Sequence, residues 1–437
     1  MMISLLIMMM FYYMGFSFLL LFFIIMVLNI IINFQMCDFI NYSLIVDNLS
    51  FILILLTLLL GIYMLLSSLS YKYFMNNYNW FNMLFFCLMY LVFLSFFVNN
   101  FFYFYLLFEF SIIPMFFLIS GWGYSVYRLE SGLYMFIYTL LTSLPFLLYL
   151  INYNMANSLN FFYKYVVFTM SSFMGNIWLM MMMLVFLVKL PIYFLHLWLP
   201  NTHVDAPLVG SMVLAGVLLK LGSYGLFKLL MISFIDFSFL MNYFISISII
   251  GSMIVSFLCM RQVDMKSLVA YSSVVHMGII ILGLYSFSYI SLLGVIFMMC
   301  AHGICSSCMF YMLNLSYNSF NSRSLIVMRG NTIISPILMI WWLMVSISNM
   351  GFPPMFNFYS ELLIIIGSIN FNKTIMYFLF MVLMFSGMYS IFFYTVFNHG
   401  NIKMINNYIN ISMCDNLIFL LHIIPLLLFM LLMNFFI

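Results

Sequence analysis

Long apolar stretches run through the whole chain and constrain its fold more than any other feature. Of its 437 residues, 68% are hydrophobic and only 5% are charged, whereas soluble domains carry about 25% charged residues. Too few polar residues are present to cover a water-facing surface, so the sequence predicts a polytopic membrane protein. Because the stretches are apolar throughout and do not alternate with polar residues, we expect helices and not the strands of a barrel.

The polar intervals divide the chain into fourteen apolar stretches, and a helix that crosses a bilayer needs about 20 such residues. The all-α fold class therefore has fourteen expected transmembrane helices, at residues 2–12, 14–33, 50–70, 79–98, 100–119, 132–153, 174–199, 207–231, 242–260, 268–286, 289–314, 333–369, 374–397 and 415–436. The twelfth is too long for one straight helix. The N-terminal residues MMISLLIMMM lack the basic region and cleavage site of a signal peptide, so we expect them to begin a helix.

Basic residues are unequally distributed between the two sets of loops. The loops after odd-numbered spans hold Lys72, Arg128, Arg261, Lys266, Arg323, Arg329 and Lys403, and those after even-numbered spans, with helix ends, hold Lys164, Lys228 and Lys373. Because basic loops stay on the cytoplasm-like side of a membrane, we expect odd-numbered loops to face the matrix or cytoplasm. The abundance of Met (45 residues) and Phe (54 residues) favours an AT-rich mitochondrial genome.

Four charged residues lie inside the expected spans: Glu109, Lys189, Lys220 and Glu361. A charge at the centre of a bilayer costs about 2.5–3.5 kcal/mol on insertion scales, so four of them require an explanation. One hypothesis is a buried ion or proton path, and the other is static ion pairs that lock helices together. Apolar packing could replace a locking pair with little loss, which favours the path.

Histidines accompany these charges. His276 and His302 lie inside the tenth and eleventh spans, and an imidazole that titrates near neutral pH can relay protons. A buried histidine is more often a hydrogen-bonded core residue, so both interpretations stay open for this pair. The relay role is weaker for His196 and His203, and for His422 the core interpretation is favoured.

Helix-breaking residues interrupt the seventh and twelfth spans. Pro191 follows Lys189 in FLVKLPIYFL, and Gly351, Pro353 and Pro354 precede Glu361 in SNMGFPPMFNFYSELLII. Proline removes a backbone donor and frees carbonyl groups, and broken helices in two halves of a transporter point to inverted repeats. We therefore expect N-terminal helices over 1–78, two inverted five-helix repeats over 79–231 and 232–397, and a final segment over 398–437.

Lys189, beside the first break, could bind and release a proton. Burial disfavours the charged form of lysine, and a nearby carboxylate favours it. A buried Lys189 with a movable acidic partner would therefore bind a proton with two different affinities.

Two other motifs carry no chemistry. Cys300, Cys305 and Cys308 have the C-x4-C-x2-C spacing of some iron–sulfur ligands, but on one apolar helix they point in different directions. The stretch GSMVLAGVLLKLGSYG lacks the GK[ST] of a phosphate loop, and its small residues suit close helix packing. We expect no metal and no cofactor in this chain.

Three long motifs resemble the antiporter-like subunits of respiratory NADH:ubiquinone oxidoreductase (complex I). They are VKLPIYFLHLWLPNTHVDAPLVGSMVLAGVLLKLGSYG at 188–225, LCMRQVDMKSLVAYSSVVHMG at 258–278 and AHGICSSCMFYML at 301–313. The resemblance extends over nearly the whole chain and implies fourteen helices. It also implies redox-driven proton translocation, with flavin, iron–sulfur clusters and ubiquinone bound by other subunits.

The resemblance assigns roles to the buried residues. It implies that Glu109 and Lys189 form an ion pair, that Lys220 is the central relay, that His276 connects Lys220 to Glu361, and that Glu361 is the terminal proton site. His302 matches a family position whose role is less defined, and related chains place a lysine where Glu361 stands.

The resemblance also implies partners and a location. The implied partners are the neighbouring antiporter-like chains 2 and 5, other membrane-arm subunits and phospholipid including cardiolipin, with no nucleic acid. The implied location is the mitochondrial inner membrane. Two other functions stay open, a subunit of a cation/proton antiporter and a non-pumping membrane scaffold.

Overall fold

The computed structural model describes residues 47–68, 77–98, 100–154, 173–232, 238–330, 332, 335–400 and 411–431. The described residues are helical, and the β pairing among them is one isolated bridge between Asp264 and Ser324. The all-α prediction is confirmed for this part of the chain. The first two expected spans, and with them Lys72, Lys164 and Lys403, lie outside the described residues.

The twelve remaining expected spans each coincide with one helix or with consecutive helices. The helices are α3 (Asn48–Ser68), α4 (Tyr78–Phe97), α5 (Phe101–Phe110), α6 (Ile112–Trp122), α7 (Arg128–Asn154), α8 (Phe173–Lys189), α9 (Trp198–Asp205), α10 (Leu208–Val213), the π-helix η3 (Leu214–Leu218), α11 (Leu219–Ile232), α12 (Ser238–Arg261), α13 (Met265–Tyr285), α14 (Tyr289–Phe320), α16 (Pro336–Met350), α17 (Phe356–Phe371), α18 (Ile375–Asn398) and α19 (Met413–Leu431). The eleventh span was expected to end at 314, but α14 continues to Phe320, where Asn321 ends it in the left-handed conformation.

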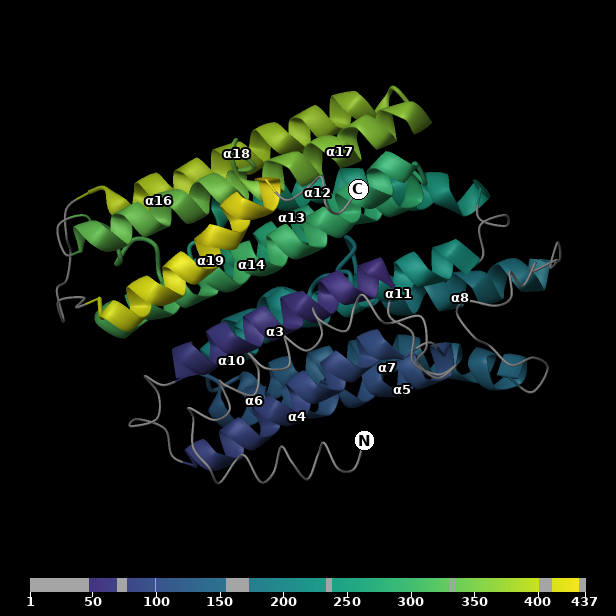
Figure 1. The fold of residues 1–437 in the computed structure, drawn as a ribbon, viewed down its shortest axis with the longest axis horizontal. Coiled ribbons are helices and arrows are strands. Elements are labelled where there is room, and N and C mark those ends of the chain that lie inside the picture. The colour runs from purple at the N-terminus through teal and green to yellow at the C-terminus, as the bar shows by residue number, and fades with distance from the viewer. Residues whose placement is uncertain are drawn as a thin grey trace.

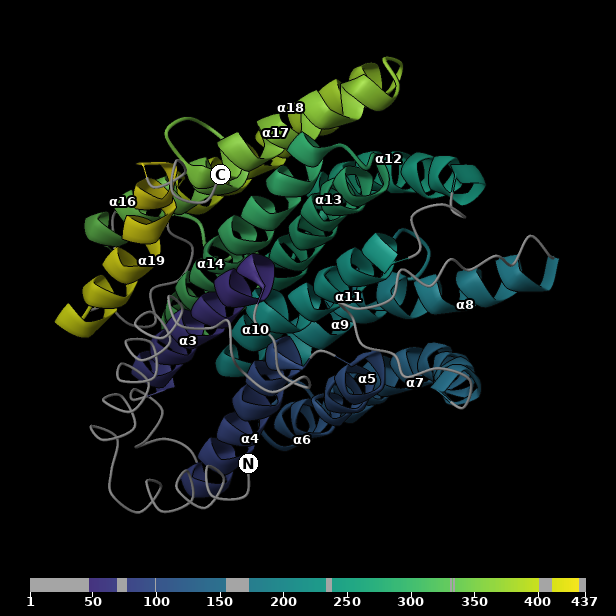
Figure 2. The ribbon, with the colours of Figure 1, turned by 45° about the vertical axis from the view of Figure 1, so that its right-hand side comes forward.

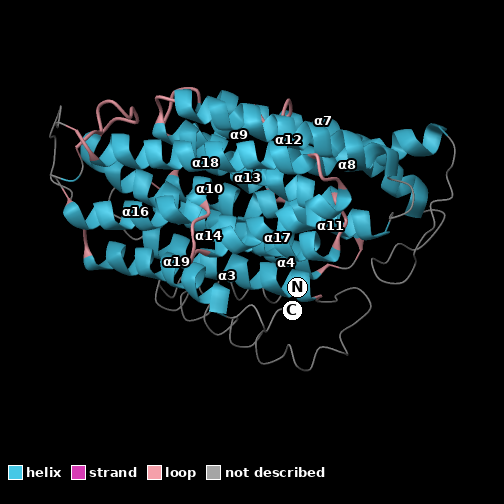
Figure 3. Ribbon diagram, turned by 90° about the horizontal axis from the view of Figure 1, so that it is seen from above, coloured by secondary structure: helices cyan, strands magenta, loops and turns pink. Residues whose placement is uncertain are grey.

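The helices form a bundle with their long axes nearly parallel (Figure 1). Helices α12 to α14 and α16 to α19 lie on one side of the bundle, and α4 to α7 lie on the other (Figures 1 and 2). Between them, α3 packs against α10, α14 and α19. A view rotated by 90° shows the same bundle built of helices joined by short loops (Figure 3).

The outer faces of the bundle are apolar. Nine of the helices in the described ranges are long and apolar enough to cross a membrane. On α7 the exposed side chains recur at helical spacing, with Leu133, Ile137, Leu141, Leu144 and Leu148 all between 46% and 69% exposed. An apolar stripe of this kind is compatible with lipid and not with water, so the chain is a multi-pass membrane protein.

The first predicted break lies between α8 and α9. Lys189 is the last residue of α8, and the chain is not helical again until Trp198. Pro191 has no N–H, and the amide of Ile192 reaches back to Leu187 at 3.3 Å. The carbonyl of Val188, left free by this arrangement, accepts a hydrogen bond of 3.0 Å from the indole of Trp198.

The second predicted break, between α16 and α17, is built in the same way. Gly351 ends α16 with a φ of 70°, a conformation that strongly favours glycine. The carbonyl of Ser348 then accepts a hydrogen bond of 2.7 Å from the side chain of Asn357, the second residue of the next helix. In both breaks a side chain after the gap therefore satisfies a carbonyl before it.

Two further irregularities were not predicted. The fifth span is interrupted at Ser111, between α5 and α6, two residues after Glu109. In the eighth span the five residues of η3 form a π-helix that ends at Leu218, two residues before Lys220. Each of the four charged residues singled out in the sequence thus lies at or near an irregular piece of helix, where backbone carbonyls are free to bind donors.

Candidate functional site

The centre of the bundle holds a contact between two titratable side chains. The ammonium of Lys220, on α11, lies 2.9 Å from Nδ1 of His302, on α14. It also donates to the carbonyl of Ala215 in the π-helix at 2.5 Å. Lys220 is 0% exposed and His302 is 1% exposed. Because an ammonium only donates, Nδ1 of His302 accepts this bond, and the proton of the neutral ring is then on Nε2.

A second pair of titratable groups lies next to the first. Nδ1 of His276, on α13, lies 3.4 Å from Oε1 of Glu361, on α17. The rings of His276 and His302 have their centroids 5.5 Å apart. The order Lys220, His302, His276, Glu361 therefore forms one buried row from α11 to α17, which we call the central row.

The structure places His302 between Lys220 and His276. The ammonium of Lys220 contacts His302, and His276 lies beside His302 and next to Glu361. The relay roles of both histidines stay predictions. The ring of His302 projects from the middle of α14 into the space between α11 and α13, because Gly303 and Gly216 allow α14 to approach the π-helix closely. A Cβ added at Gly303 would lie 3.1 Å from the carbonyl oxygen of Gly216.

Lys189 is buried and Glu109 is half-buried near it, but the two do not form the expected salt bridge. The ammonium of Lys189 lies 3.3 Å from the ring centroid of Phe108, an attractive cation–π arrangement. Both carboxylate oxygens of Glu109 are buried, and the hydroxyl of Ser143 and the ammonium of Lys189 both act on this carboxylate. The ammonium of Lys189 thus lies on an aromatic ring that nothing in the sequence singled out, and Glu109 attracts it from a longer distance.

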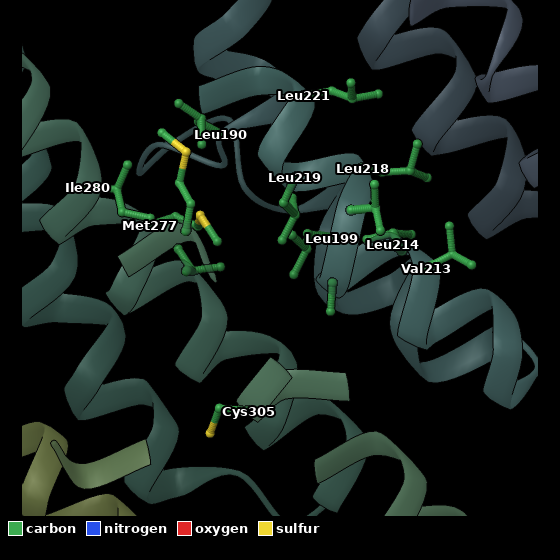
Figure 4. Packing of buried hydrophobic residues seen from close by; sticks show 14 of the residues in the cluster. Leu190, Leu199, Val213, Leu214, Leu218, Leu219, Leu221, Met277, Ile280 and Cys305 are labelled. Atoms are coloured by element: carbon green, nitrogen blue, oxygen red, sulfur yellow. The ribbon is translucent and has the colours of Figure 1, made fainter. Parts of the chain in front are cut away.

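A small cavity lies beside Lys189. Its volume is about 20 Å³, and its lining includes Lys189 and Trp198 as well as Leu218 and Leu219, the two residues before Lys220. A volume of this size is enough for about one water molecule. Apart from Lys189 and Thr139, most of the lining is apolar. Figure 4 shows the buried apolar side chains of this region, among them leucines of η3 and α11 and Met277 and Ile280 of α13.

Lys266 was expected in an exposed loop, but the structure shows that it is buried. It is 5% exposed at the start of α13, and its ammonium lies 3.3 Å from the carbonyl of Ala206, at the C-terminal end of α9. Arg323 donates to the neighbouring carbonyl of Val204 at 3.0 Å. Cations at a helix C-terminus are stabilising, so these two residues fix the second half of the first broken helix.

The remaining histidines have different surroundings. His203 is fully buried and stacked on Phe310 with a centroid distance of 4.7 Å, and neither of its ring nitrogens has a hydrogen-bond partner among the described residues. His422 donates from Nδ1 to the carbonyl of Ile418 at 2.8 Å, and its ring lies against Tyr63. This contact agrees with the core interpretation of His422.

The cysteines do not gather into a metal site in the described part of the chain. Cys300, Cys305 and Cys308 are buried with free thiols, and Cys305 contacts the hydroxyl of Ser348 at 3.1 Å. Within the described ranges, no three His, Cys, Asp or Glu side chains are placed to hold a metal ion.

Comparison with known proteins decides the family. The family described as NADH:quinone oxidoreductase/Mrp antiporter, TM matches residues 98–388. NADH-ubiquinone oxidoreductase chain 4 of Ceratitis capitata is 40% identical over 385 residues, which are 85% of this chain and 83% of that protein. The chain belongs to the NADH-ubiquinone oxidoreductase chain 4 family. The chain 4 protein of Rhipicephalus sanguineus is 38% identical over 402 residues, covering 91% of this chain and 90% of the relative.

Solved structures with the same fold come from the wider family. A chain of respiratory complex I from Thermus thermophilus with bound NADH matches with a TM-score of 0.82 and 19% identity, over 90% of this chain and 83% of that chain. A chain of the Mrp complex from Dietzia sp. DQ12-45-1b matches with a TM-score of 0.84 and 14% identity, over 96% and 90%. At these identities the likeness concerns the fold alone.

Proposed function

We propose that this chain translocates protons in the membrane arm of NADH-ubiquinone oxidoreductase, along the central row of Lys220, His302, His276 and Glu361. The observation that carries the proposal is that these four side chains are at most 4% exposed and follow one another at short distances. Burying so many titratable groups in a membrane protein is costly. A proton path requires them, and a scaffold does not.

Proton transfer along the row uses both ring nitrogens of His302 and Nδ1 of His276. A proton leaves the ammonium of Lys220 for Nδ1 of His302, and the proton on Nε2 of that ring is released toward His276. In the proposed path a water molecule carries this proton between the two rings, whose centroids lie 5.5 Å apart. His276 then passes a proton from Nδ1 to Oε1 of Glu361, which is 3.4 Å away.

Lys189 controls the entry to the row. In the proposed cycle its ammonium moves between the ring of Phe108, where it lies now, and the carboxylate of Glu109. Two opposite charges 4 Å apart attract each other by about 4 kcal/mol at an effective dielectric constant of 20. Moving one charge across a membrane costs about 2.3 kcal/mol per 100 mV. The energy of forming or breaking this pair is therefore similar to the energy needed to move a proton past Lys189 against the membrane potential.

The chain itself carries no redox centre in this proposal. Flavin, iron–sulfur clusters and ubiquinone belong to other subunits, and the partners in the membrane arm are the antiporter-like chains 2 and 5, with phospholipid including cardiolipin at the outer faces. The chain lies in the mitochondrial inner membrane with its odd-numbered loops in the matrix. The basic residues Arg261, Arg323 and Arg329 in those loops support this orientation.

The two proposed inverted repeats, 79–231 and 232–397, share one design. The carbonyl of Val188 is bound by Trp198 across the first break, and the carbonyl of Ser348 is bound by Asn357 across the second. The same solution at corresponding places in both halves supports an origin by duplication.

The experiment is substitution of Lys220 in the assembled complex. Lys220→Ala should abolish or strongly reduce the number of protons moved per electron in proteoliposomes, while Lys373→Ala, which removes an exposed lysine, should leave that number unchanged. Normal pumping by an assembled Lys220→Ala complex would contradict the proposal. Purification without flavin and iron–sulfur proteins would instead favour a subunit of a separate cation/proton antiporter.

A further inference from the structure

Asn349 contacts the ring nitrogen of His276 that does not face Glu361. Its Oδ1 lies 3.1 Å from Nε2 of His276, and Nδ1 on the other side of the ring faces Glu361. Asn349 is 4% exposed and is the second-last residue of α16, directly before the break. A buried amide beside a titratable ring can decide which of its nitrogens carries the proton.

The chemistry of the contact fixes the tautomer. A carbonyl oxygen only accepts, so Nε2 of His276 donates to Asn349, and the neutral ring then has its lone pair on Nδ1. We propose that Asn349 is a positioning residue that keeps a proton on Nε2 of His276, so that Nδ1 is the atom that takes up and releases the transported proton. This inference rests on the proposed function, since it assigns the atom at which His276 acts.

The backbone around Asn349 is held in place. The preceding carbonyl, that of Ser348, accepts a hydrogen bond from Asn357, and Gly351 ends the helix two residues later. A cavity of about 10 Å³ borders Asn349 and is also lined by Tyr389. The hydroxyl of Tyr389 is buried, and the side chain of Asn349 acts on it as a hydrogen-bonding neighbour. A phenol oxygen can accept from the amide N–H of Asn349, and this favours the orientation in which Oδ1 faces His276.

Two substitutions at this position should act in opposite directions. When Nδ1 takes up a proton, the ring becomes positively charged while Nε2 still donates to residue 349. Asn349→Ala removes the acceptor and disfavours the charged ring, so the pH optimum of pumping should move to lower pH. Asn349→Asp places a carboxylate there and favours the charged ring, so the optimum should move to higher pH. A hydrogen bond to a charged group corresponds to a shift of about one pH unit or more.

The test compares pH profiles of proton pumping in the assembled complex. The titratable groups on the surrounding helices are the same in all variants: Glu361, His302, Cys305, Tyr389, Cys259 and, behind His302, Lys220. The matched control is Asn314→Ala, because Asn314 is also 4% exposed and its Oδ1 also accepts one hydrogen bond, from Tyr124, away from the row. Its profile should equal that of the unaltered complex.

The result that overturns the inference is no shift, or shifts of the same sign, in Asn349→Ala and Asn349→Asp while Lys220→Ala abolishes pumping. If Asn349→Ala does not assemble, the position of the Asn349→Asp optimum decides, and an optimum that does not move to higher pH overturns the inference. Normal pumping in Lys220→Ala would instead overturn the proposed function and this inference with it.

Discussion

The ammonium of Lys220 and Nδ1 of His302 lie 2.9 Å apart, and both residues are almost completely buried. The two residues lie on α11 and α14, which are far apart in the sequence, so packing of these two helices is what brings them together. This contact ties the first half of the chain to the second. It makes the central row continuous across the two proposed repeats.

Lys189→Ala should nearly abolish coupled proton pumping without preventing assembly. The lysine sits beside the first helix break, and its charge is held by the ring of Phe108 and not by a salt bridge. Its removal therefore breaks no salt bridge in the described structure. The measurement is protons moved per electron, with assembly followed by native electrophoresis and Lys373→Ala as the control. An assembled Lys189→Ala complex with an unchanged ratio would refute this role.

Gly351→Ala should destabilise the second break and lower pumping. Gly351 has a φ of 70°, and a Cβ there would lie 2.5 Å from Oε2 of Glu361. A side chain in this conformation costs about 1–2 kcal/mol before the clash with the carboxylate is counted. Thermal unfolding of the purified complex should begin at a lower temperature.

The control for this substitution is Gly121→Ala, because no atom lies within 4 Å of the Cβ it would add. It should leave both the unfolding temperature and pumping unchanged. Equal behaviour of the two variants would mean that the space beside Glu361 is not constrained.

Cys305→Ser should change no paramagnetic signal of the purified complex. The three cysteines of α14 are free, and Cys305 is occupied by its contact with Ser348. Serine keeps a donor and an acceptor at this position, so packing should also survive. Loss of an iron–sulfur signal in the Cys305→Ser complex would show that these residues bind a cluster after all.

The spans and breaks could be predicted because their causes are local. A run of apolar residues long enough to cross a bilayer identifies a helix, and Pro191, Gly351, Pro353 and Pro354 mark the interruptions. The four buried charges were also visible, since their cost in an apolar segment depends on the segment alone. These features need no knowledge of which helices touch.

The partners of the charges could not be predicted because they depend on packing. The π-helix before Lys220 contains only residues that ordinary helices accept, and it lies where α14 approaches Gly216 closely. The ring of Phe108 next to Lys189 is one of 54 phenylalanines. Asn349 had one recognisable feature in the sequence: it is a polar amide two residues before Gly351, the glycine of the second break. This feature could have identified it as a candidate site residue.

Glu361→Gln tests the central claim most directly. Glutamine keeps the shape and the hydrogen-bonding atoms of the side chain beside His276 but cannot take up and release a proton. Lysine can titrate, so Glu361→Lys should retain part of the activity. The matched control is Glu130→Gln, which removes an exposed carboxylate in the first turn of α7. In proteoliposomes, with assembly checked separately, we predict that Glu361→Gln moves far fewer protons per electron than either Glu130→Gln or the unaltered complex. Equal pumping by all three would show that Glu361 is structural and that protons leave by another route.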